Sequence, residues 1–196
     1  MATGGRVGPA ASGLADETTW RRQARFFPCR RRQFFGTRGT WGKKTGPNPT
    51  DRRKAGSKHH LLVDAQGTPL NVILTEANRH DVTQLMPLLD GIMPIAGKPG
   101  RPLYKPKCVQ ADRGYDSSSH RRDLRSRGID HQIARRRTGH GSNLGKTRWV
   151  VERTIAWLHQ FRRLRVRYER LPSIHEALLR IGCAIICWRS LKNLFC

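Results

Sequence analysis

Two acidic residues lie where a metal-dependent reaction could use them. Asp112 ends the short apolar segment CVQAD (108–112), which is typical of a β-strand, and Gly114 breaks the chain soon after it. Glu152 lies in a segment with helical spacing, four residues after Arg148. Carboxylates are the ligands that Mg²⁺ prefers, and paired ions can hold both reacting oxygens of a phosphodiester. Asp112 equally fits an ordinary turn, and Glu152 fits a helix-surface ion pair worth only ~0.3–0.5 kcal/mol.

The charge of the chain indicates a polyanionic partner. Its 196 residues, enough for one domain, include 38 Lys and Arg against 14 Asp and Glu, a net charge of +24. Nucleic acid is the default partner of so basic a protein, and an anionic membrane surface is the rival. The longest apolar run, Ile181–Trp188, is flanked by Arg180 and Arg189 and falls far short of the ~20 residues that a membrane span needs.

The cysteines and the N-terminus indicate the cellular compartment of the protein. Five cysteines stand at irregular spacing without a CxxC pair, so a zinc module is not expected and reduced thiols of a cytosolic protein fit best. The N-terminus carries no charged-then-apolar secretory signal. We therefore expect a cytoplasmic protein without a membrane partner.

Hydrophobic periodicity predicts a mixed α/β domain. Strands joined by a short turn are expected over 59–78, with further strands over 108–112 and 129–134, and helices over 81–92, 117–128, 147–164 and from 173 onward. Asp81 and Gln84 have the spacing of a capping box, and His59 and His60 are expected to be solvated or to contact phosphate. The last helix is apolar nearly all round from 181 to 188, which predicts burial.

The first 44 residues differ from the rest. No acidic residue occurs between Thr18 and Thr50, and RRQARFFPCRRRQFF mixes arginine with phenylalanine without a period of 2 or 3.6. A disordered basic arm would explain this, and so would out-of-frame or degraded coding sequence. We expect residues 1–44 to be such an arm and 45–196 to be the ordered domain.

Several motifs in order resemble the bacterial insertion-sequence transposases of the DDE type. The matching stretches include TGPNPTDRRKAGSKHHLLVDAQGTPL, LTEANRHDVTQLMPLLD, ADRGYD and RWVVERTIAWLHQFRRLRVRYER. The resemblance covers about Thr45 to Trp188. It implies an RNase H-like mixed sheet flanked by helices, with the N-terminal part incomplete or disordered.

The resemblance also implies a function and a set of site residues. Asp112 would be the second catalytic acid and Glu152 the third, both holding Mg²⁺ or Mn²⁺, and Arg148 would orient Glu152 or hold a phosphate. The implied reaction is metal-dependent cleavage of DNA at the element ends and strand transfer into target DNA. The implied partners are double-stranded DNA and further copies of the chain, at the bacterial nucleoid. The basic residues expected to contact DNA are Lys58, Arg113, Arg135, Arg136, Arg137, Arg153, Arg162 and Arg163.

The first acid of this family lies on the first strand, shortly before the TGPNPTD stretch. Here that segment is PCRRRQFFGTRGTWGKK, which contains no acid. Asp51 is a poor substitute, Asp64 lies at the hairpin turn, and Asp16 and Glu17 are far upstream. A decayed gene or a frameshifted reading frame would explain the loss. We expect the chain to be weakly active or inactive alone, and the alternative is a non-catalytic DNA-binding remnant.

Overall fold

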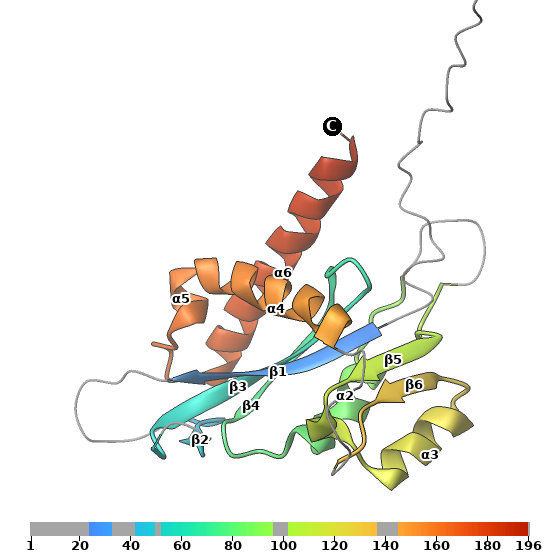
Figure 1. Ribbon diagram of the computed structural model, residues 1–196. Helices are drawn as coiled ribbons and strands as arrows, with labels where there is room; N and C mark the ends of the chain where they lie inside the picture. Colours follow the sequence, from blue (N-terminus) through green and yellow to red (C-terminus); the bar gives the residue numbers. More distant parts are fainter. Residues whose placement is uncertain (1–23, 33–41, 50–51, 96–101, 137–144, 196) are drawn as a thin grey trace, which may run out of the picture.

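The computed structural model describes residues 24–32, 42–49, 52–95, 102–136 and 145–195 as one mixed sheet with helices on both faces (Figure 1). The strands are β1 (Ala24–Arg32), β2 (Gly46–Pro47), β3 (Ala55–Val63), β4 (Pro69–Glu76), β5 (Cys108–Ala111) and β6 (Asp130–Ile133). The helices are η1 (Asp81–Gln84), α2 (Leu85–Asp90), η2 (Arg113–Tyr115), α3 (Ser118–Ser126), α4 (Gly145–Gln160), α5 (Arg162–Arg165) and α6 (Pro172–Phe195).

The sheet joins an antiparallel half to a parallel half. β3 pairs antiparallel with β4 and with β1, and β1 then pairs parallel with β5, which pairs parallel with β6. The two-residue strand β2 extends the β4 edge of β3. This strand order, with helices on both faces, confirms the RNase H-like α/β class that the sequence predicted.

Strand β1 lies where the sequence analysis placed a basic arm. It pairs with β3 on one edge and with β5 on the other, and α4 packs against it. Main-chain hydrogen bonds to β3 and β5 hold the strand in the sheet, and these bonds do not require a particular side-chain pattern. The boundary expected at residue 45 therefore does not match the edge of the sheet. The remaining residues of the expected arm up to 41 lie outside those described.

The other predicted elements are confirmed, with changes at their ends. The hairpin is β3 and β4, and the expected strands at 108–112 and 129–134 are β5 and β6. The helix expected over 147–164 is instead α4 followed by the short α5, because Phe161 takes an extended conformation (ψ 112°) between them. Asp81 begins η1 but does not cap it, since His80 holds the cap position without a side-chain hydrogen bond.

Two apolar clusters lie on opposite faces of the sheet. Leu61 and Val63 pack with side chains of α4, α5 and α6, whereas Leu62 packs with those of α2 and α3. Successive residues of a strand point to opposite faces, so β3 contributes to both clusters. Val109 and Ala111 of β5 belong to the same cluster as Leu62. β3 is therefore buried on both sides.

Helix α6 is buried on one side only. Leu179 and Ile186 are buried, and α6 packs against β4, while Ile181 and Trp188 are more than half exposed. Its C-terminal part extends away from the sheet (Figure 1). The expectation of burial all round is therefore wrong for this helix. No helix in the described part of the chain is long and apolar enough to cross a membrane.

Four consecutive polar residues of β3, Ser57 to His60, are buried. The expectation that both histidines are solvated is therefore wrong. His60 makes ring-nitrogen hydrogen bonds with the Tyr115 hydroxyl (3.2 Å) and the Thr75 hydroxyl (2.8 Å). Burial lowers the pKa of His60 to about 4, although Asp81 opposes this effect.

A buried arginine connects three segments on the α6 side of β3. Arg167 is 1% exposed and donates to the Ser57 hydroxyl (2.6 Å) and to the carbonyls of Lys43 (3.1 Å) and Glu169 (2.9 Å). Burial lowers the pKa of Arg167, and Glu169 opposes this effect. Its guanidinium thus joins the segment before β2, strand β3 and the segment between α5 and α6.

The Arg167→Lys substitution is expected to lower the free energy of unfolding by about 2–4 kcal/mol. An ammonium keeps the charge but cannot reach the same set of diverging acceptors, and unmade hydrogen bonds to a buried charged group are costly. Urea denaturation measures the change. The matched control is Arg162→Lys at an exposed position, expected to change stability by less than about 0.5 kcal/mol. Equal losses in the two variants would contradict the role of Arg167.

The stability of the fold is expected to fall as the pH drops from 6.5 toward 4. An unfolded chain protonates His60 near pH 6.5 whereas the folded protein resists protonation down to about pH 4. In this window the unfolded state binds one more proton, so His60 contributes a slope of about 1.4 kcal/mol per pH unit. Chemical denaturation at several pH values should show a shallower slope for His60→Gln. His80→Gln, at an exposed histidine, is the control and should leave the slope unchanged.

Candidate active site

Asp112 directly follows β5 and begins a tight turn. Its Oδ1 accepts a hydrogen bond from the Arg113 backbone N–H (2.7 Å) and so caps η2. The residue is half-buried and keeps an extended conformation (ψ 164°). A carboxylate has two oxygens and several acceptor positions, so the cap leaves ligand capacity. The turn role and a ligand role are compatible in this geometry.

The alternation of β5 assigns Asp112 to the face that α4 covers. Val109 and Ala111 belong to the cluster on the α2 and α3 face. Asp112 continues the extended backbone by one residue, so its side chain belongs to the opposite face. That face carries α4, which packs against β1 and β3 (Figure 1). The two predicted acids, Asp112 and Glu152, therefore belong to the same side of the sheet.

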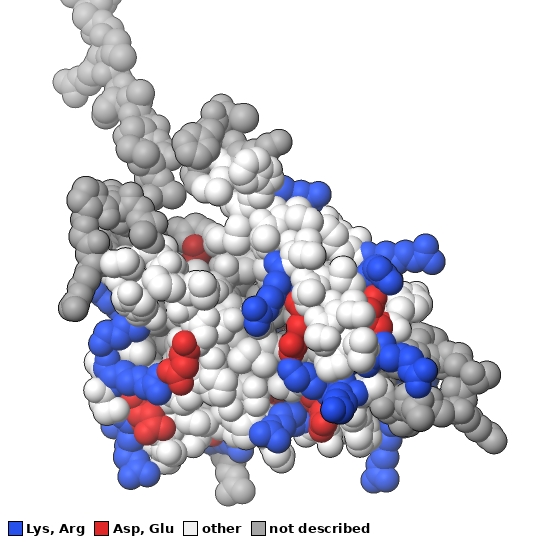
Figure 2. Space-filling view, turned by 180° about the vertical axis from the view of Figure 1, so that it is seen from behind, with Lys and Arg blue, Asp and Glu red and all other residues white. Residues whose placement is uncertain are grey.

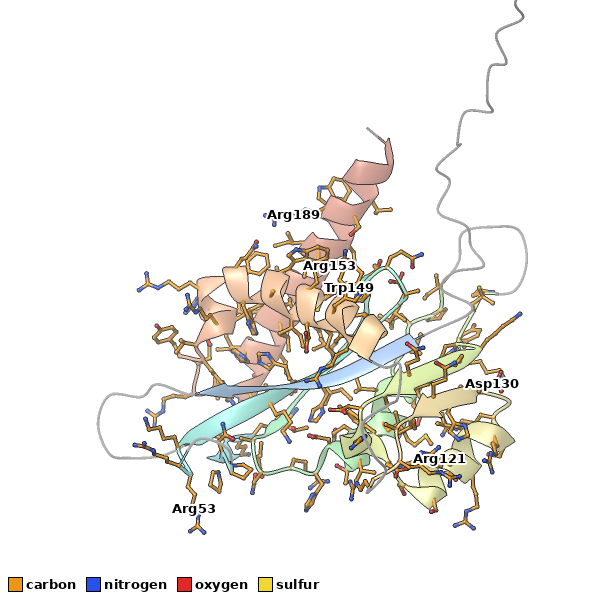
Figure 3. The ribbon with its side chains drawn as sticks, viewed as in Figure 1. Arg53, Arg121, Asp130, Trp149, Arg153 and Arg189 are labelled. Atoms are coloured by element: carbon orange, nitrogen blue, oxygen red, sulfur yellow. The ribbon has the colours of Figure 1, made fainter. Side chains whose placement is uncertain are left out.

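The turn from Asp112 to Asp116 is held by several hydrogen bonds. Asp116 Oδ1 accepts from Nε (3.0 Å) and Nη2 (2.8 Å) of Arg121, and its Oδ2 accepts from the backbone N–H of Arg136 (2.8 Å). The Arg136 guanidinium donates to the carbonyls of Arg113 (3.3 Å) and Gly114 (3.2 Å). Burial alone would raise the pKa of Asp116, but the hydrogen bonds from Arg136 and Arg121 hold it below its ordinary value. Figure 3 labels Arg121 on α3.

Glu152 lies on the exposed side of α4. Its Oε1 accepts from Arg148 Nε (2.7 Å), the contact expected from their spacing, and both side chains are about half exposed. Val151 and Thr154 on the same helix are buried. An exposed pair of this kind contributes little stability, so Glu152 remains accessible to solvent and to a ligand.

The adjoining edge of α4 is fastened to the turn between β3 and β4. The Arg153 guanidinium lies between the rings of Trp149 and Trp157, with centroid distances of 4.7 and 4.8 Å, and donates to the Gln66 carbonyl. Thr154 Oγ1 donates to the Gly67 carbonyl (2.7 Å). Figure 3 shows Trp149 and Arg153 on α4. These contacts fix the helix that carries Glu152.

A third carboxylate beside Asp112 is not supplied by the neighbouring strand. Phe26 of β1 pairs with Ala111, so continuing the parallel register by one residue places Phe27 beside Asp112. β1 contains no acidic residue. Asp64 instead holds its own turn by accepting from the backbone of Gln66 (2.9 Å) and Thr68 (2.8 Å).

The donor types fit a hard cation, but the described residues do not form a complete set. They contain no group of three or more His, Cys, Asp or Glu residues that could hold a metal. Mg²⁺ is usually bound by one or two carboxylates and keeps several waters. Asp112 and Glu152 could supply the carboxylates. The other candidates for the first acid, Asp16, Glu17 and Asp51, lie outside the described residues.

The predicted DNA-contacting residues fall into different environments. Lys58 is 1% exposed and donates to Asp81 Oδ1 (2.5 Å). The prediction that Lys58 contacts DNA is therefore wrong, because its side chain is buried and its charge is paired with Asp81. Arg153 is engaged by the two tryptophans, and Arg137 lies outside the described residues. Exposed members of the set are Arg135, Arg136, Arg162 and Arg163, and Arg113 is half-buried.

The face opposite to that of Figure 1 is bordered by basic side chains. Figure 2 shows Lys and Arg along both lower sides of this face, interspersed with acidic groups. Among the predicted DNA-contacting arginines, Arg163 is partly neutralised, because its Nε lies 3.0 Å from Glu169 Oε1. A surface with more basic than acidic side chains suits contacts to phosphates.

Sequence comparison shows relatives along most of the chain. The transposase of insertion sequence IS402 from Burkholderia cepacia is 59% identical over 186 residues, covering 92% of this chain and 88% of the relative. The transposase of IS1106 from Neisseria meningitidis serogroup B is 34% identical over 145 residues, and the match covers 68% of this chain but only 45% of that protein.

Two solved structures are also similar in arrangement. The HTLV-2 integrase catalytic core domain in complex with magnesium gives a TM-score of 0.47 at 11% identity, covering 83% of this chain and 82% of that one. The BIV integrase catalytic core domain gives a TM-score of 0.42 at 11% identity, covering 83% and 81%.

The family described as "Transposase DDE domain" matches residues 12–187. This match begins well before the boundary expected at residue 45 and includes β1. Together with the 59% identity to the IS402 transposase, it shows that this chain belongs to the DDE transposases of bacterial insertion sequences.

Proposed function

We propose that this chain binds insertion-sequence DNA and carries out metal-dependent strand cleavage and strand transfer at the element ends. The family is one of DNA transposition. The observation that carries the proposal is the position of Asp112, at the end of a parallel strand, on the side of the sheet that α4 covers. There it belongs to the same face as Glu152.

In this proposal Asp112 and Glu152 would hold Mg²⁺ or Mn²⁺, and Arg148 orients Glu152 through the Nε–Oε1 contact. A bound divalent ion supplies stabilisation of the charge that develops on the phosphate oxygens. The exposed residues Arg135, Arg136 and Arg162 hold the DNA by neutralising phosphates. Assembly of several copies on the two element ends and action at the bacterial nucleoid belong to the same proposal.

A second candidate function is non-catalytic DNA binding. It is favoured by one observation: the register position beside Asp112 in β1 is occupied by Phe27, where the resemblance expects an acid. A site with two carboxylates would retain DNA contacts but bind the metal less well. The chain could then occupy element ends without cutting them.

If the first proposal holds, Asp112→Asn and Glu152→Gln each lower Mg²⁺-dependent cleavage of a duplex ending in the element's terminal repeat by more than about 100-fold. Even residues that merely hold metal ligands in place are worth about 10–100-fold. Gel-resolved strand cleavage is the measurement, with DNA binding followed in parallel. Asp123→Asn, on α3, is the control and should retain activity.

Cleavage that survives both substitutions would overturn the metal assignment. Native protein that binds the same duplex but cuts it neither with Mg²⁺ nor with Mn²⁺ would establish the second candidate instead.

If the missing acid limits activity, Phe27→Asp is expected to raise Mg²⁺-dependent cleavage at least about tenfold, because a third carboxylate would then adjoin Asp112. The matched control is Phe26→Asp. Residue 26 pairs with Ala111 and not with the position of Asp112, so it should give no gain. An equal gain in cleavage from both substitutions would show that the gain does not depend on placing the carboxylate beside Asp112.

A further inference from the structure

A buried ion pair lies directly behind the turn that carries Asp112. Lys58 Nζ donates to Asp81 Oδ1 (2.5 Å) and to the Arg79 carbonyl (2.7 Å). The Lys58 side chain is 1% exposed and that of Asp81 is 13% exposed. Removing two charges from water is costly, so such a pair is weak evidence of a role in stability alone.

Asp81 approaches the middle of the turn closely. A Cβ added at Gly114 would lie 3.2 Å from Asp81 Oδ2 and 3.6 Å from Asp81 Cβ. The glycines with positive φ among the described residues are Gly67 and Gly128, so the backbone of Gly114 does not itself demand glycine. A side chain at residue 114 would therefore press on the Asp81 carboxylate, which would have to shift by a few tenths of an ångström. η1 and η2 pack against each other at this contact.

Tyr115 also anchors this turn. Its ring is fully buried, and its hydroxyl lies 3.2 Å from His60 Nδ1. Burial raises the pKa of Tyr115 well above its ordinary value, and both Asp81 and Asp112 raise it further. Both carboxylates are thus near the phenol of Tyr115.

We propose that Asp81, held in place by Lys58, is a positioning residue that fixes the Asp112–Asp116 turn against β3 and thereby sets the direction of the Asp112 carboxylate. The inference rests on the role proposed for Asp112. Asp81 acts through contact with Gly114, and Lys58 fixes Asp81 while cancelling its charge. Neither residue touches DNA or metal.

Two double variants separate this role from stability. Lys58→Met with Asp81→Asn removes both charges but keeps the shape that contacts Gly114. Lys58→Met with Asp81→Ala removes both charges and the carboxylate that approaches Gly114, leaving only the Cβ of residue 81. Neither leaves an unpaired buried charge, which a single substitution would do. The Asn variant is the matched control for the Ala variant.

Three readouts follow the turn and the site. Amide hydrogen exchange of Arg113 reports the hydrogen bond from its N–H to Asp112 Oδ1, with Val109 in β5 as the internal reference. Titration with Mn²⁺ alone reports metal affinity. Cleavage kinetics separate kcat from KM.

The Ala variant is expected to exchange the Arg113 amide at least about tenfold faster than native protein, to bind Mn²⁺ about 10–100-fold more weakly, and to lose kcat with KM unchanged. The Asn variant should stay within about threefold of native protein in all three. Equal behaviour of the Ala and Asn variants, or unchanged Arg113 exchange in the Ala variant, would overturn the proposal.

Gly114→Ala tests the same contact without disturbing the ion pair. It should speed Arg113 exchange in the native background. It should have little effect in the Ala variant, where only the Cβ of residue 81 remains at ordinary contact distance (3.6 Å), so that the two sites are coupled. Additive effects of Gly114→Ala and the Ala variant on Arg113 exchange would overturn the proposed contact between Asp81 and Gly114.

Failure of the proposed function gives a different result. If Asp112→Asn changes neither Mn²⁺ binding nor cleavage while the Ala variant still speeds Arg113 exchange, the contact of Asp81 with the turn is supported and the catalytic role of Asp112 is overturned.

Discussion

Four consecutive polar side chains buried in the middle of a sheet must each find a partner, and this constraint organises the molecule around β3. A buried polar group without a hydrogen bond is costly, and a buried charge more so. Ser57 accepts from Arg167, Lys58 pairs with Asp81, His59 Nε2 lies 3.0 Å from His175 Nε2, and His60 bonds with Tyr115. Each contact brings a distant segment to the strand.

The two faces of β3 receive different partners because successive side chains alternate. Ser57 and His59 meet Arg167 and His175, from the segment after α5 and from α6. Lys58 and His60 meet η1 and η2, and η2 directly follows Asp112. His175 is also bonded to Glu169 (3.2 Å), and burial lowers its pKa while Glu169 opposes this effect. One strand thus connects the helical layer with the turn that carries Asp112.

Membership in the DDE transposases and the chemistry of this particular chain are separate matters. The match over residues 12–187 places the chain in the family, and the RNase H-like sheet brings Asp112 to the face that α4 covers. Yet the strand beside Asp112 carries Phe27 at the adjoining position and no acid anywhere along its length. The fold is therefore that of the family, and of the acids that the resemblance implies, Asp112 and Glu152 lie in the described part of the chain. Their role in holding a cation belongs to the proposal.

Local patterns in the sequence were sufficient for whatever depends on near neighbours. The hairpin of β3 and β4, helices α3 and α6, and the contact of Arg148 with Glu152 all follow from periods of 2 and 3.6 residues, which involve residues a few positions apart. The motif resemblance likewise identified Asp112 and Glu152 as the residues to examine. Charge indicated a polyanionic partner for the chain as a whole, but not which cations face the solvent.

The tertiary structure decided what depends on partners distant in sequence. β1 has no periodic signal to mark it, and its place between β3 and β5 comes from pairing with residues 24 to 85 positions away. Lys58 is a cation of the kind that contacts DNA, but its partner Asp81 is 23 residues away in the sequence and is brought beside it only by the fold. The buried histidines of β3 and the close approach of Asp81 to Gly114 arise in the same way. Sequence alone thus determined most of the elements and the candidate residues on them, whereas only packing determined the place of β1, which charges are paired inside the protein and which face the solvent.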